Sequence, residues 1–326
     1  MPTLFVAKAG GHLTELLEIA TRLPRNGDDV ELWATNENEQ SRSLLADKPH
    51  VFVPYIDAKD VIGVAKCLPL ARRLHREHKF TRAISTGSGT ALPFLPYLTL
   101  RGVPCHFIET ATRLDKPSLT GRMMSMVPGI RLYTQYDERA VGRWHRTGWV
   151  FDRFNAVQQT DRPVIRRAVV AAGSSNSGYP FRRMLEAVAA LLRPEGELER
   201  AQEAPVETLW QTGGTPIDGL GIDGREWVPT DELDSAIANA DLVITHAGTG
   251  SAFSTMTAGR FPVLIPRDPA RGEIGDTHQR LFAAELEKDG LAMRREPEEL
   301  TVEDLLEAAT YRVESITHPT PIKLEP

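Results

Sequence analysis

A run of small and hydroxyl residues, His246–Ser251, directly follows a strand-like segment, Asp241–Thr245. A glycine turn between a buried strand and a helix points backbone N–H groups and the positive end of the helix dipole at an anion, and a diphosphate suits such a turn. Gly248 and Gly250 would let the backbone approach phosphates, while Thr249 or Ser251, with His246, adds polar side chains. A tight strand–helix turn with a capping serine explains the glycine spacing alone equally well.

A second polar pair follows the next strand-like segment, Pro262–Pro266. Asp276 and Gln279 lie three residues apart where a helix should begin, so a carboxylate and an amide could both face the hydroxyl groups of a bound sugar. A capping box, with Asp276 as the N-cap and Gln279 at the third helical position, is the competing interpretation.

Two further glycine turns follow strand-like segments of the second half. Gln211 ends the segment 208–211 and is followed by Thr212 and Gly213, and Gly173, Ser174 and Asn176 follow the segment 168–171. Each turn alone is a common loop. Together with the first two elements they are candidate donor-binding residues.

Short apolar segments alternate with helical periodicity along the chain, which is the pattern of parallel strand–helix units. Strands are expected at 4–7, 30–34, 51–54, 83–85, 104–108, 131–134, 168–171, 208–211, 226–228, 242–245 and 263–265. Helices are expected at 12–23, 61–75, 181–192, 233–238, 251–258 and 278–288. The pattern predicts an α/β protein with two Rossmann-like, doubly wound domains, whose glycine turns face a common central cleft at the carboxyl ends of the strands.

The pattern restarts near residue 165, which predicts a domain boundary there. We expect a first domain over residues 1–150, a linker over 151–164 and a second domain over 165–326. The proline-rich tail, 317–326, either stays flexible or packs back on the first domain.

Composition and charge exclude several classes of protein. The 326 residues are 41% hydrophobic and 25% charged, as in an ordinary soluble globular protein. The net charge is −6, with +5 over the first 150 residues and −11 over the rest, and there is no dense basic patch of the kind that nucleic-acid binding needs. Cys67 and Cys105 are expected to be buried thiols. We expect a cytoplasmic protein, since no segment has the features of a signal peptide or a membrane span.

The second half, roughly residues 166–310, resembles the donor domain of GT-B glycosyltransferases related to the enzyme that makes lipid II. It is more similar still to the catalytic subunit of the two-subunit transferase that adds the second GlcNAc to dolichol diphosphate. The resemblance implies that His246, Gly248, Gly250 and Ser251, with Asp276 and Gln279, hold the nucleotide diphosphate and the sugar. Gly173, Ser174, Asn176 and Phe181 match the first glycine turn of that subunit. One position departs from the pattern, because Ser254 stands where relatives often carry a carboxylate for the ribose.

The first half resembles the membrane-anchoring partner subunit of the same enzymes and its bacterial exopolysaccharide counterparts. The matching stretches are Gly10–Glu15, Thr86–Gly89, Phe107–Arg113 and Ser118–Arg122. The two parts are fused here with the acceptor half first, and the membrane helix usual in that subunit is not seen. By this resemblance Gly11, Ser88 and Arg113 are expected to bind the acceptor.

Glycosyl transfer by this fold normally inverts the sugar, so the enzyme needs a general base and stabilisation of the leaving diphosphate. His12 and Glu109 are the two candidates for the base. A buried ion pair between Glu109 and Arg113 is the alternative role for the carboxylate. Because no Asp-x-Asp motif occurs in a strand-end loop, we expect no metal and no cofactor, with a nucleotide-sugar, expected to be a UDP-sugar, as co-substrate.

The expected acceptor is a polyprenyl-diphosphate-linked saccharide of polysaccharide or cell-envelope synthesis. Basic residues of the first half, Arg72, Arg73, Arg76, Lys79 and Arg82, cluster near Leu68, Leu70 and Leu74, and Arg122–Val127 is a second apolar segment with a basic start. Such patches suit peripheral contact with an anionic membrane at the inner face of the plasma membrane, although a solvated helix face and a core methionine run explain either patch alone. Three other functions stay open: a soluble transferase acting on a small natural product, a UDP-sugar 2-epimerase, and a non-catalytic nucleotide-sugar binder.

Overall fold

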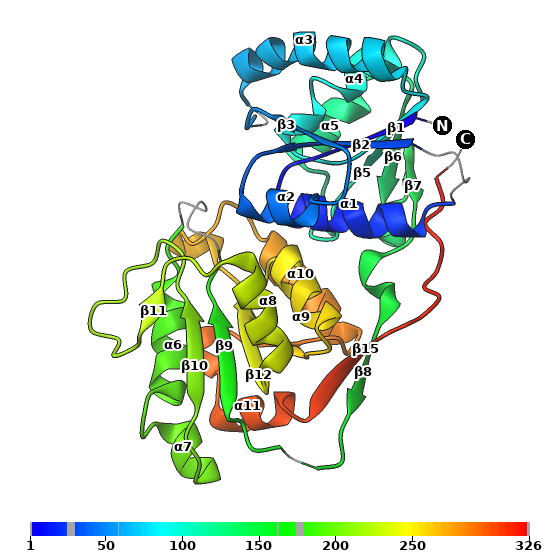
Figure 1. The fold of residues 1–326 in the computed structure, drawn as a ribbon. Coiled ribbons are helices and arrows are strands. Elements are labelled where there is room, and N and C mark those ends of the chain that lie inside the picture. The colour runs from blue at the N-terminus through cyan, green and yellow to red at the C-terminus, as the bar shows by residue number, and fades with distance from the viewer. Residues whose placement is uncertain (1, 25–29, 58, 162, 174–178, 325–326) are drawn as a thin grey trace. The chain divides into compact units, whose positions relative to one another are not determined.

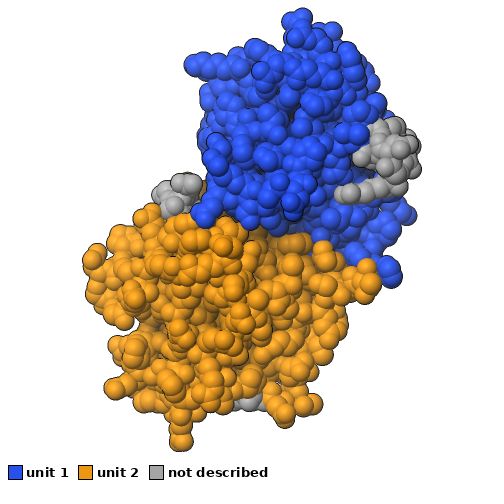
Figure 2. Space-filling model, viewed as in Figure 1, with its two compact units in different colours: residues 1–152, 318–326 blue, residues 153–317 orange. Residues whose placement is uncertain are grey.

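The computed structural model describes residues 2–24, 30–57, 59–161, 163–173 and 179–324. The chain forms two compact units (Figure 2). Unit 1 comprises residues 1–152 together with 318–326, and unit 2 comprises residues 153–317.

Unit 1 is built on a seven-stranded parallel sheet with the order β3-β2-β1-β4-β5-β6-β7. Its strands are β1 (Pro2–Ala7), β2 (Val30–Asn36), β3 (His50–Val53), β4 (Arg82–Gly87), β5 (Cys105–Ile108), β6 (Ile130–Thr134) and β7 (Trp144–Arg146). The chain runs outward from β1 to β3 and then returns to the other side of β1 with β4. The carboxyl ends of β1 and β4 therefore flank a topological switch point, where open α/β sheets bind ligands.

Helices cover both faces of this sheet (Figure 1). They are α1 (Gly11–Arg22), α2 (Glu39–Leu44), α3 (Val61–His78), α4 (Leu95–Thr99) and α5 (Leu119–Ser125), with the short turns η1 (Gly89–Ala91), η2 (Asp137–Arg139) and η3 (Val150–Arg153). On one face Leu74 of α3, Leu98 of α4 and Met124 of α5 join the core that contains Leu4 and Leu132. Leu74 and Met124 thus belong to the core and are not part of an exposed apolar patch.

Unit 2 contains a six-stranded parallel sheet with the order β11-β10-β9-β12-β13-β14. Its strands are β9 (Arg167–Ala171), β10 (Glu207–Gln211), β11 (Gly224–Arg225), β12 (Leu242–His246), β13 (Pro262–Ile265) and β14 (Met293–Arg294). Its helices and short turns are α6 (Arg182–Leu192), α7 (Glu197–Gln202), α8 (Thr230–Asn239), α9 (Thr249–Thr257), η5 (Pro269–Arg271), α10 (His278–Lys288), η6 (Pro297–Glu299) and α11 (Val302–Ala308). The switch point of this sheet lies between β9 and β12.

The strand expected at 226–228 is not formed. Only Gly224 and Arg225 pair with β10. The N–H of Val228 donates instead to the side chain of Gln211, at 3.1 Å. Val228 is fully buried, whereas Trp227 is exposed, so one buried apolar residue in a loop gives the segment the apolar character of a strand.

The residues between the two sheets differ from the expected linker at 151–164. Phe154–Gln158 form β8, which pairs antiparallel with β15 (Tyr311–Ser315) inside unit 2. The ring of Phe154 packs edge-on against Phe253, with centroids 5.3 Å apart. The partner strand lies about 150 residues later in the chain, so local periodicity could not indicate the pairing.

The end of the chain packs on unit 1, whereas the expected second domain extended to residue 326. The buried guanidinium of Arg22 donates to the carbonyl of Thr320, with Nε at 3.0 Å, and to the carboxylate of Asp152 at 2.6 Å. Ile322 is fully buried. Of the two alternatives for the tail, the structure shows the packed one. No described helix is long and apolar enough to cross a membrane.

Candidate active site

His12 lies at the switch point of unit 1, in the first turn of α1. Its Nδ1 is 2.9 Å from the carbonyl oxygen of Thr86 in β4, and the Thr86 hydroxyl donates back to the carbonyl of His12 at 2.7 Å. A carbonyl oxygen can only accept, so Nδ1 must carry the proton. The neutral ring therefore has its basic lone pair on Nε2, which is the tautomer that a general base at this position needs.

The turn after β4 is held in an unusual backbone conformation. Ser88 has φ of +67° and ψ of 170°, a region that is essentially confined to glycine and costs about 1–3 kcal/mol for other residues. Gly89 beside it admits no side chain, because a Cβ there would lie 2.4 Å from the carbonyl oxygen of Ile56. Ser88 follows the carboxyl end of β4, and Gly11 and His12 follow the carboxyl end of the neighbouring strand β1. The sequence predicts acceptor binding at these strand ends.

Glu109 has a structural explanation in this fold. Its Oε1 accepts from the backbone N–H of Ser118 at 2.8 Å and from the Ser118 hydroxyl at 3.0 Å. A Cβ at Gly121 would lie 1.9 Å from the same oxygen. Burial raises the pKa of Glu109, and the hydrogen bonds from Ser118, and then the charge of Arg113, only partly oppose that effect. Glu109 and Arg113 line a small space of about 10 Å³, room for about one water.

Through these contacts Glu109, directly after β5, holds Ser118, directly before α5, and so fixes the loop between them. Ser118 in turn accepts from the N–H of Gly121 and caps α5. A carboxylate that already accepts two hydrogen bonds from Ser118 is poorly placed to take a proton from a substrate. His12 is the stronger of the two candidates for the base.

In unit 2, His246 is the last residue of β12 and Thr249 begins α9. Between them, a side chain at Gly248 would require the ring of His246 to move, since a Cβ there would lie 2.5 Å from its Nε2. Thr249 is buried, while Gly250 and Ser251 are half-buried in the first turn of the helix. The first N–H groups of a helix have no partner within it and can bind an anion, so donor binding stays the prediction for this turn.

The imidazole of His246 is electrically neutral at physiological pH. Burial, and then the charge of Arg267, lower its pKa to about 4. Its Nδ1 faces the carbonyl of Ala171 in β9 at 3.4 Å, so the ring connects the two strands that flank the switch point. His246 therefore forms a wall of the site and brings no positive charge to it.

The other predicted donor residues divide into lining residues and supports. Gly173, with φ of +112°, lines a cavity of about 90 Å³. Ser174 and Asn176 lie outside the described residues. The Gln211 amide donates weakly to the carbonyl of Gly173 at 3.4 Å and accepts from Val228, and the Thr212 hydroxyl donates to backbone carbonyls.

Gly213 completes this turn in a left-handed conformation, with φ of +60°. Gln211 and Thr212 are both buried and bonded to the backbone. The turn after β10 thus supports the strand ends rather than presenting its side chains to the cavity.

Asp276 and Gln279 do not form the capping box. Helix α10 begins at His278 after Thr277, whose side chain makes no capping hydrogen bond. Asp276 instead accepts from the backbone N–H of His278 at 3.2 Å and contacts its ring. The Oε1 atom of Gln279 accepts from the backbone N–H of Arg267 at 3.1 Å. This bond fixes the orientation of the amide at the wall of the cavity.

The cavity of unit 2 brings together residues from four separate segments. They are Gly173, Tyr179, His246, Arg267, Glu273, Ile274 and Gln279. Ser254 is half-buried in α9, beyond the glycine turn. Three of the predicted donor residues, Gly173, His246 and Gln279, thus share one described cavity.

Two polar residues of these sites were not singled out from the sequence. Glu15 in α1 is fully buried, and its Oε2 accepts from the N–H of Ala111 at 2.9 Å and from the amide of Gln135 at 3.0 Å. Arg267 follows β13 and is 4% exposed. The position of Glu15 three residues after His12 on one helix was an available signal, whereas nothing local indicated that Arg267 would be buried.

Comparison with known proteins agrees with this geometry. Residues 220–320 match the model of the glycosyltransferase family 28 C-terminal domain. The UDP-N-acetylglucosamine–N-acetylmuramyl-(pentapeptide) pyrophosphoryl-undecaprenol N-acetylglucosamine transferase of Solibacter usitatus is 25% identical, over 92% of this chain and 84% of that protein.

A second relative matches a shorter part of the chain. The UDP-N-acetylglucosamine transferase subunit ALG13 of Kluyveromyces lactis is 36% identical over 23% of this chain and 36% of the subunit. Among solved structures, MurG of Acinetobacter baumannii superposes with a TM-score of 0.56 at 19% identity, over 94% of this chain and 89% of that one. The two parallel sheets with their glycine turns indicate the same fold as these similarities. The chain is a glycosyltransferase with the GT-B fold, and it is similar to the N-acetylglucosamine transferases named above.

Proposed function

We propose that the protein moves a sugar from a nucleotide-sugar to a hydroxyl group of a lipid-linked saccharide, with inversion and without a metal ion. The observation that carries the proposal is the hydrogen bond between Nδ1 of His12 and the carbonyl of Thr86. It sets the tautomer that a proton acceptor needs, at the strand ends where this fold binds ligands.

The proposed step is a single displacement. The acceptor oxygen forms a bond to the anomeric carbon as the bond from that carbon to the diphosphate oxygen breaks, and the electron pair of that bond leaves with the diphosphate. Nε2 of His12 takes the acceptor proton. The N-terminal turn of α9 and the glycine turn at Gly173 would stabilise the leaving diphosphate through backbone N–H groups.

The chemical names of the relatives support the substrate class. The Solibacter usitatus enzyme and a second relative, from Idiomarina loihiensis, are both named as transferring N-acetylglucosamine to a pyrophosphoryl-undecaprenol acceptor. Each aligns over more than four fifths of its own length. A UDP-sugar donor and a polyprenyl-diphosphate acceptor are therefore the substrates that we propose.

Peripheral membrane contact is the accompanying proposal. Helix α3 carries exposed apolar residues, Val61, Ile62 and Leu68, on the same helix as the exposed Arg72 and Arg76. Apolar side chains beside basic ones bind anionic lipid surfaces. Flotation with anionic vesicles checks this part, and a protein that stays at the bottom of the gradient contradicts it.

The test of the function begins with a thermal-shift panel of UDP-, GDP- and dTDP-sugars. A donor present at a hundred times its dissociation constant stabilises the folded protein by about 2.7 kcal/mol. The stabilising donor is then incubated with and without a polyprenyl-diphosphate saccharide, in parallel reactions with and without EDTA, and the anomeric configuration of the product is read by NMR.

Each outcome of this assay separates the competing functions. Acceptor-dependent transfer with inversion supports the proposal. Isomerisation or hydrolysis without acceptor indicates a 2-epimerase, and donor binding without turnover indicates a non-catalytic binder. Transfer only to small soluble acceptors indicates a natural-product enzyme, and activity lost with EDTA contradicts metal independence.

A further inference from the structure

Arg267 joins three segments of backbone around the cavity of unit 2. Its Nη2 donates to the carbonyl of Ala172 at 2.7 Å, and its Nη1 donates to the carbonyls of Tyr179 and, at 3.2 Å, Glu273. The guanidinium also lies over the ring of Phe181, 5.0 Å from its centroid. One side chain thus holds the backbone beside Gly173, at Tyr179 and in the loop after β13.

The charge of Arg267 is not balanced by a carboxylate. Within the part of the chain that the structure describes, its partners are carbonyl groups, which are dipoles without net charge. The nearby Glu273 carboxylate is bonded on both oxygens to Arg183, at 3.0 and 2.9 Å, and one of them also accepts from the N–H of Asp268. Burial lowers the pKa of Arg267 to about 10, and the charge of Glu273 only partly opposes this effect.

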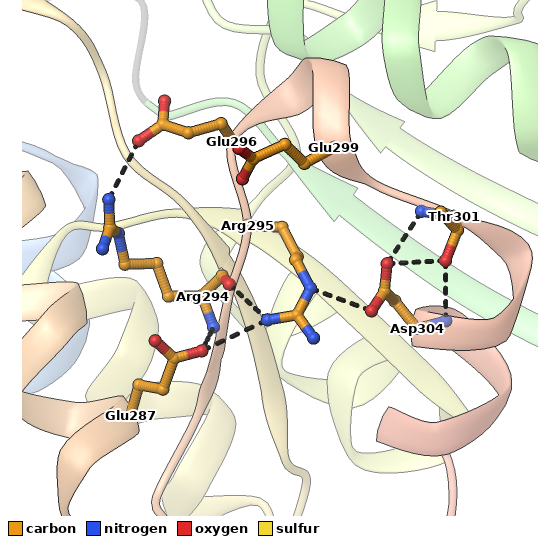
Figure 3. A pocket seen from close by; sticks show the side chains of 7 residues that line it. All are labelled: Glu287, Arg294, Arg295, Glu296, Glu299, Thr301 and Asp304. Carbon is orange, nitrogen blue, oxygen red and sulfur yellow. Dashed lines mark hydrogen bonds and ion pairs between the residues drawn. The ribbon is translucent and has the colours of Figure 1, made fainter.

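In a second cavity of unit 2 the arginine charges are balanced by carboxylates. This cavity of about 470 Å³ is lined by Glu287, Arg294, Arg295, Glu296, Glu299, Thr301 and Asp304. Figure 3 shows that both arginines meet carboxylates: Arg295 bonds to Asp304 at 2.8 Å and to Glu287 at 3.2 Å, and Arg294 bonds to Glu296 at 3.1 Å. Its positive charges are neutralised before any ligand arrives, so the larger cavity is not an anion site.

The other groups around Arg267 do not neutralise its positive charge. His246 is neutral at pH 7 because its pKa lies near 4. Gln279 contributes an amide, and Glu273 is already paired with Arg183. A buried cation without a counter-charge is costly, and an ionised ligand supplies the missing charge.

We propose that Arg267 is the residue through which this cavity distinguishes an ionised diphosphate from an uncharged nucleoside. It is a positioning and specificity residue, since its hydrogen bonds go to the backbone and its positive charge acts across the cavity. The inference rests on the proposed function, because it takes the donor to be a nucleotide-sugar bound in unit 2.

The test is calorimetric titration of UDP, UMP and uridine into wild type, Arg267→Lys, Arg267→Met and the control Arg295→Met. If the thermal-shift panel selects another base, its nucleotides replace these. The Arg295 variant removes a half-buried arginine of the same unit whose charge is balanced. We expect Arg267→Met to weaken UDP binding at least about tenfold and uridine binding by less than about threefold. Arg267→Lys keeps the charge and should retain most of the preference, and Arg295→Met should retain all of it.

Equal losses of UDP and uridine affinity in Arg267→Met would overturn the inference, since a brace for the backbone affects both ligands alike. If Arg267→Met does not fold, the thermal shift of wild type and Arg267→Lys with inorganic diphosphate decides. Stabilisation of both proteins supports an anion site, and no stabilisation of either contradicts it. Wild-type protein that binds no nucleotide at all would instead contradict the proposed function.

Discussion

His12 and His246 each lie at the switch point of their own unit, and their differences show how similar contacts serve two purposes. The ring of His12 connects α1 to Thr86 of β4 through Nδ1, and the ring of His246 connects β12 to Ala171 of β9 through the same atom. The first contact is short, at 2.9 Å, and the second is loose, at 3.4 Å. Both fix the same tautomer. Burial, and then the charge of the buried Arg267, prevent the protonation of His246. The backbone therefore sets the tautomer of His246, whereas burial and the neighbouring charge set its pKa.

The largest expected effect separates the two rings by activity. His12→Ala should lower kcat by about 10²- to 10⁴-fold, because general-base catalysis contributes that much. Its donor dissociation constant, measured by calorimetry, should stay within about twofold of wild type. His246→Ala is the counterpart and should weaken donor binding instead. Wild-type turnover by His12→Ala would remove His12 as the base.

Acid stability is the second way to sharpen the comparison. The pKa of His246 is about 4 when folded, against an ordinary value of 6.5. Between these two values the unfolded chain binds more protons than the folded one, so stability is complete above pH 6.5 and falls as the pH drops toward 4. The loss from this group is on the order of 3 kcal/mol.

His246→Asn should shrink the difference in Tm between pH 7 and pH 4.5. The matched group in unit 1 is His106, which is buried in β5 and whose pKa burial also lowers to about 4. It keeps part of the acid sensitivity in the variant. An unchanged difference in Tm would mean that His246 is not held neutral by the fold.

The glycines beside the rings give a smaller effect. Gly248→Ala would press its Cβ against Nε2 of His246, at 2.5 Å, and overpacking of this kind costs about 1–3 kcal/mol. We expect about a tenfold loss of donor affinity by calorimetry. The double variant with His246→Ala should bind donor no more weakly than His246→Ala alone, because the clash is gone. Strictly additive losses would contradict that contact.

Gly10→Ala is the matched change in unit 1. Gly10 has φ of +105°, but a Cβ there meets nothing within 4 Å. It should therefore cost backbone strain, seen as a lower Tm, and leave donor affinity unchanged. A loss of donor affinity equal to that of Gly248→Ala would show that the effect does not depend on His246.

The smallest expected effect concerns Glu109. Glu109→Gln keeps an oxygen that accepts from Ser118, so kcat should fall by less than about tenfold if the residue only closes its loop. A loss of 10²-fold or more at unchanged Tm would restore Glu109 as a candidate base. Steady-state kinetics and thermal unfolding of the same preparation decide between these results.

The sequence was most informative where a strand, a glycine turn and a helix follow one another directly. Strands β1, β4, β9 and β12 and their turns were predicted for this reason, because parallel strand–helix units repeat a local pattern. The pairing of β8 with β15 could not be predicted, since its two strands lie far apart in the chain. Register and partner choice in such pairs depend on tertiary packing.

The candidate site shows the same limit. Gly173, His246 and Gln279 were predicted from turn chemistry and from resemblance, and the fold brings them to one cavity. The burial of Arg267 could not be predicted, because its acceptors are backbone carbonyls of residues far away in sequence. Likewise the sequence left Glu109 open between base and structural roles. Only its contacts with Ser118 favour the second.

The packing of the last residues on unit 1 has a consequence for gene architecture. Unit 2 is encoded by one uninterrupted stretch, 153–317, whose first and last strands, β8 and β15, pair with each other. It has the form of an insertion whose ends meet, and such segments are the ones that recombination can transfer whole. Unit 1 is encoded in two pieces. A stop codon after β15 would consequently damage unit 1, by removing Ile322 from its core and Thr320 from Arg22.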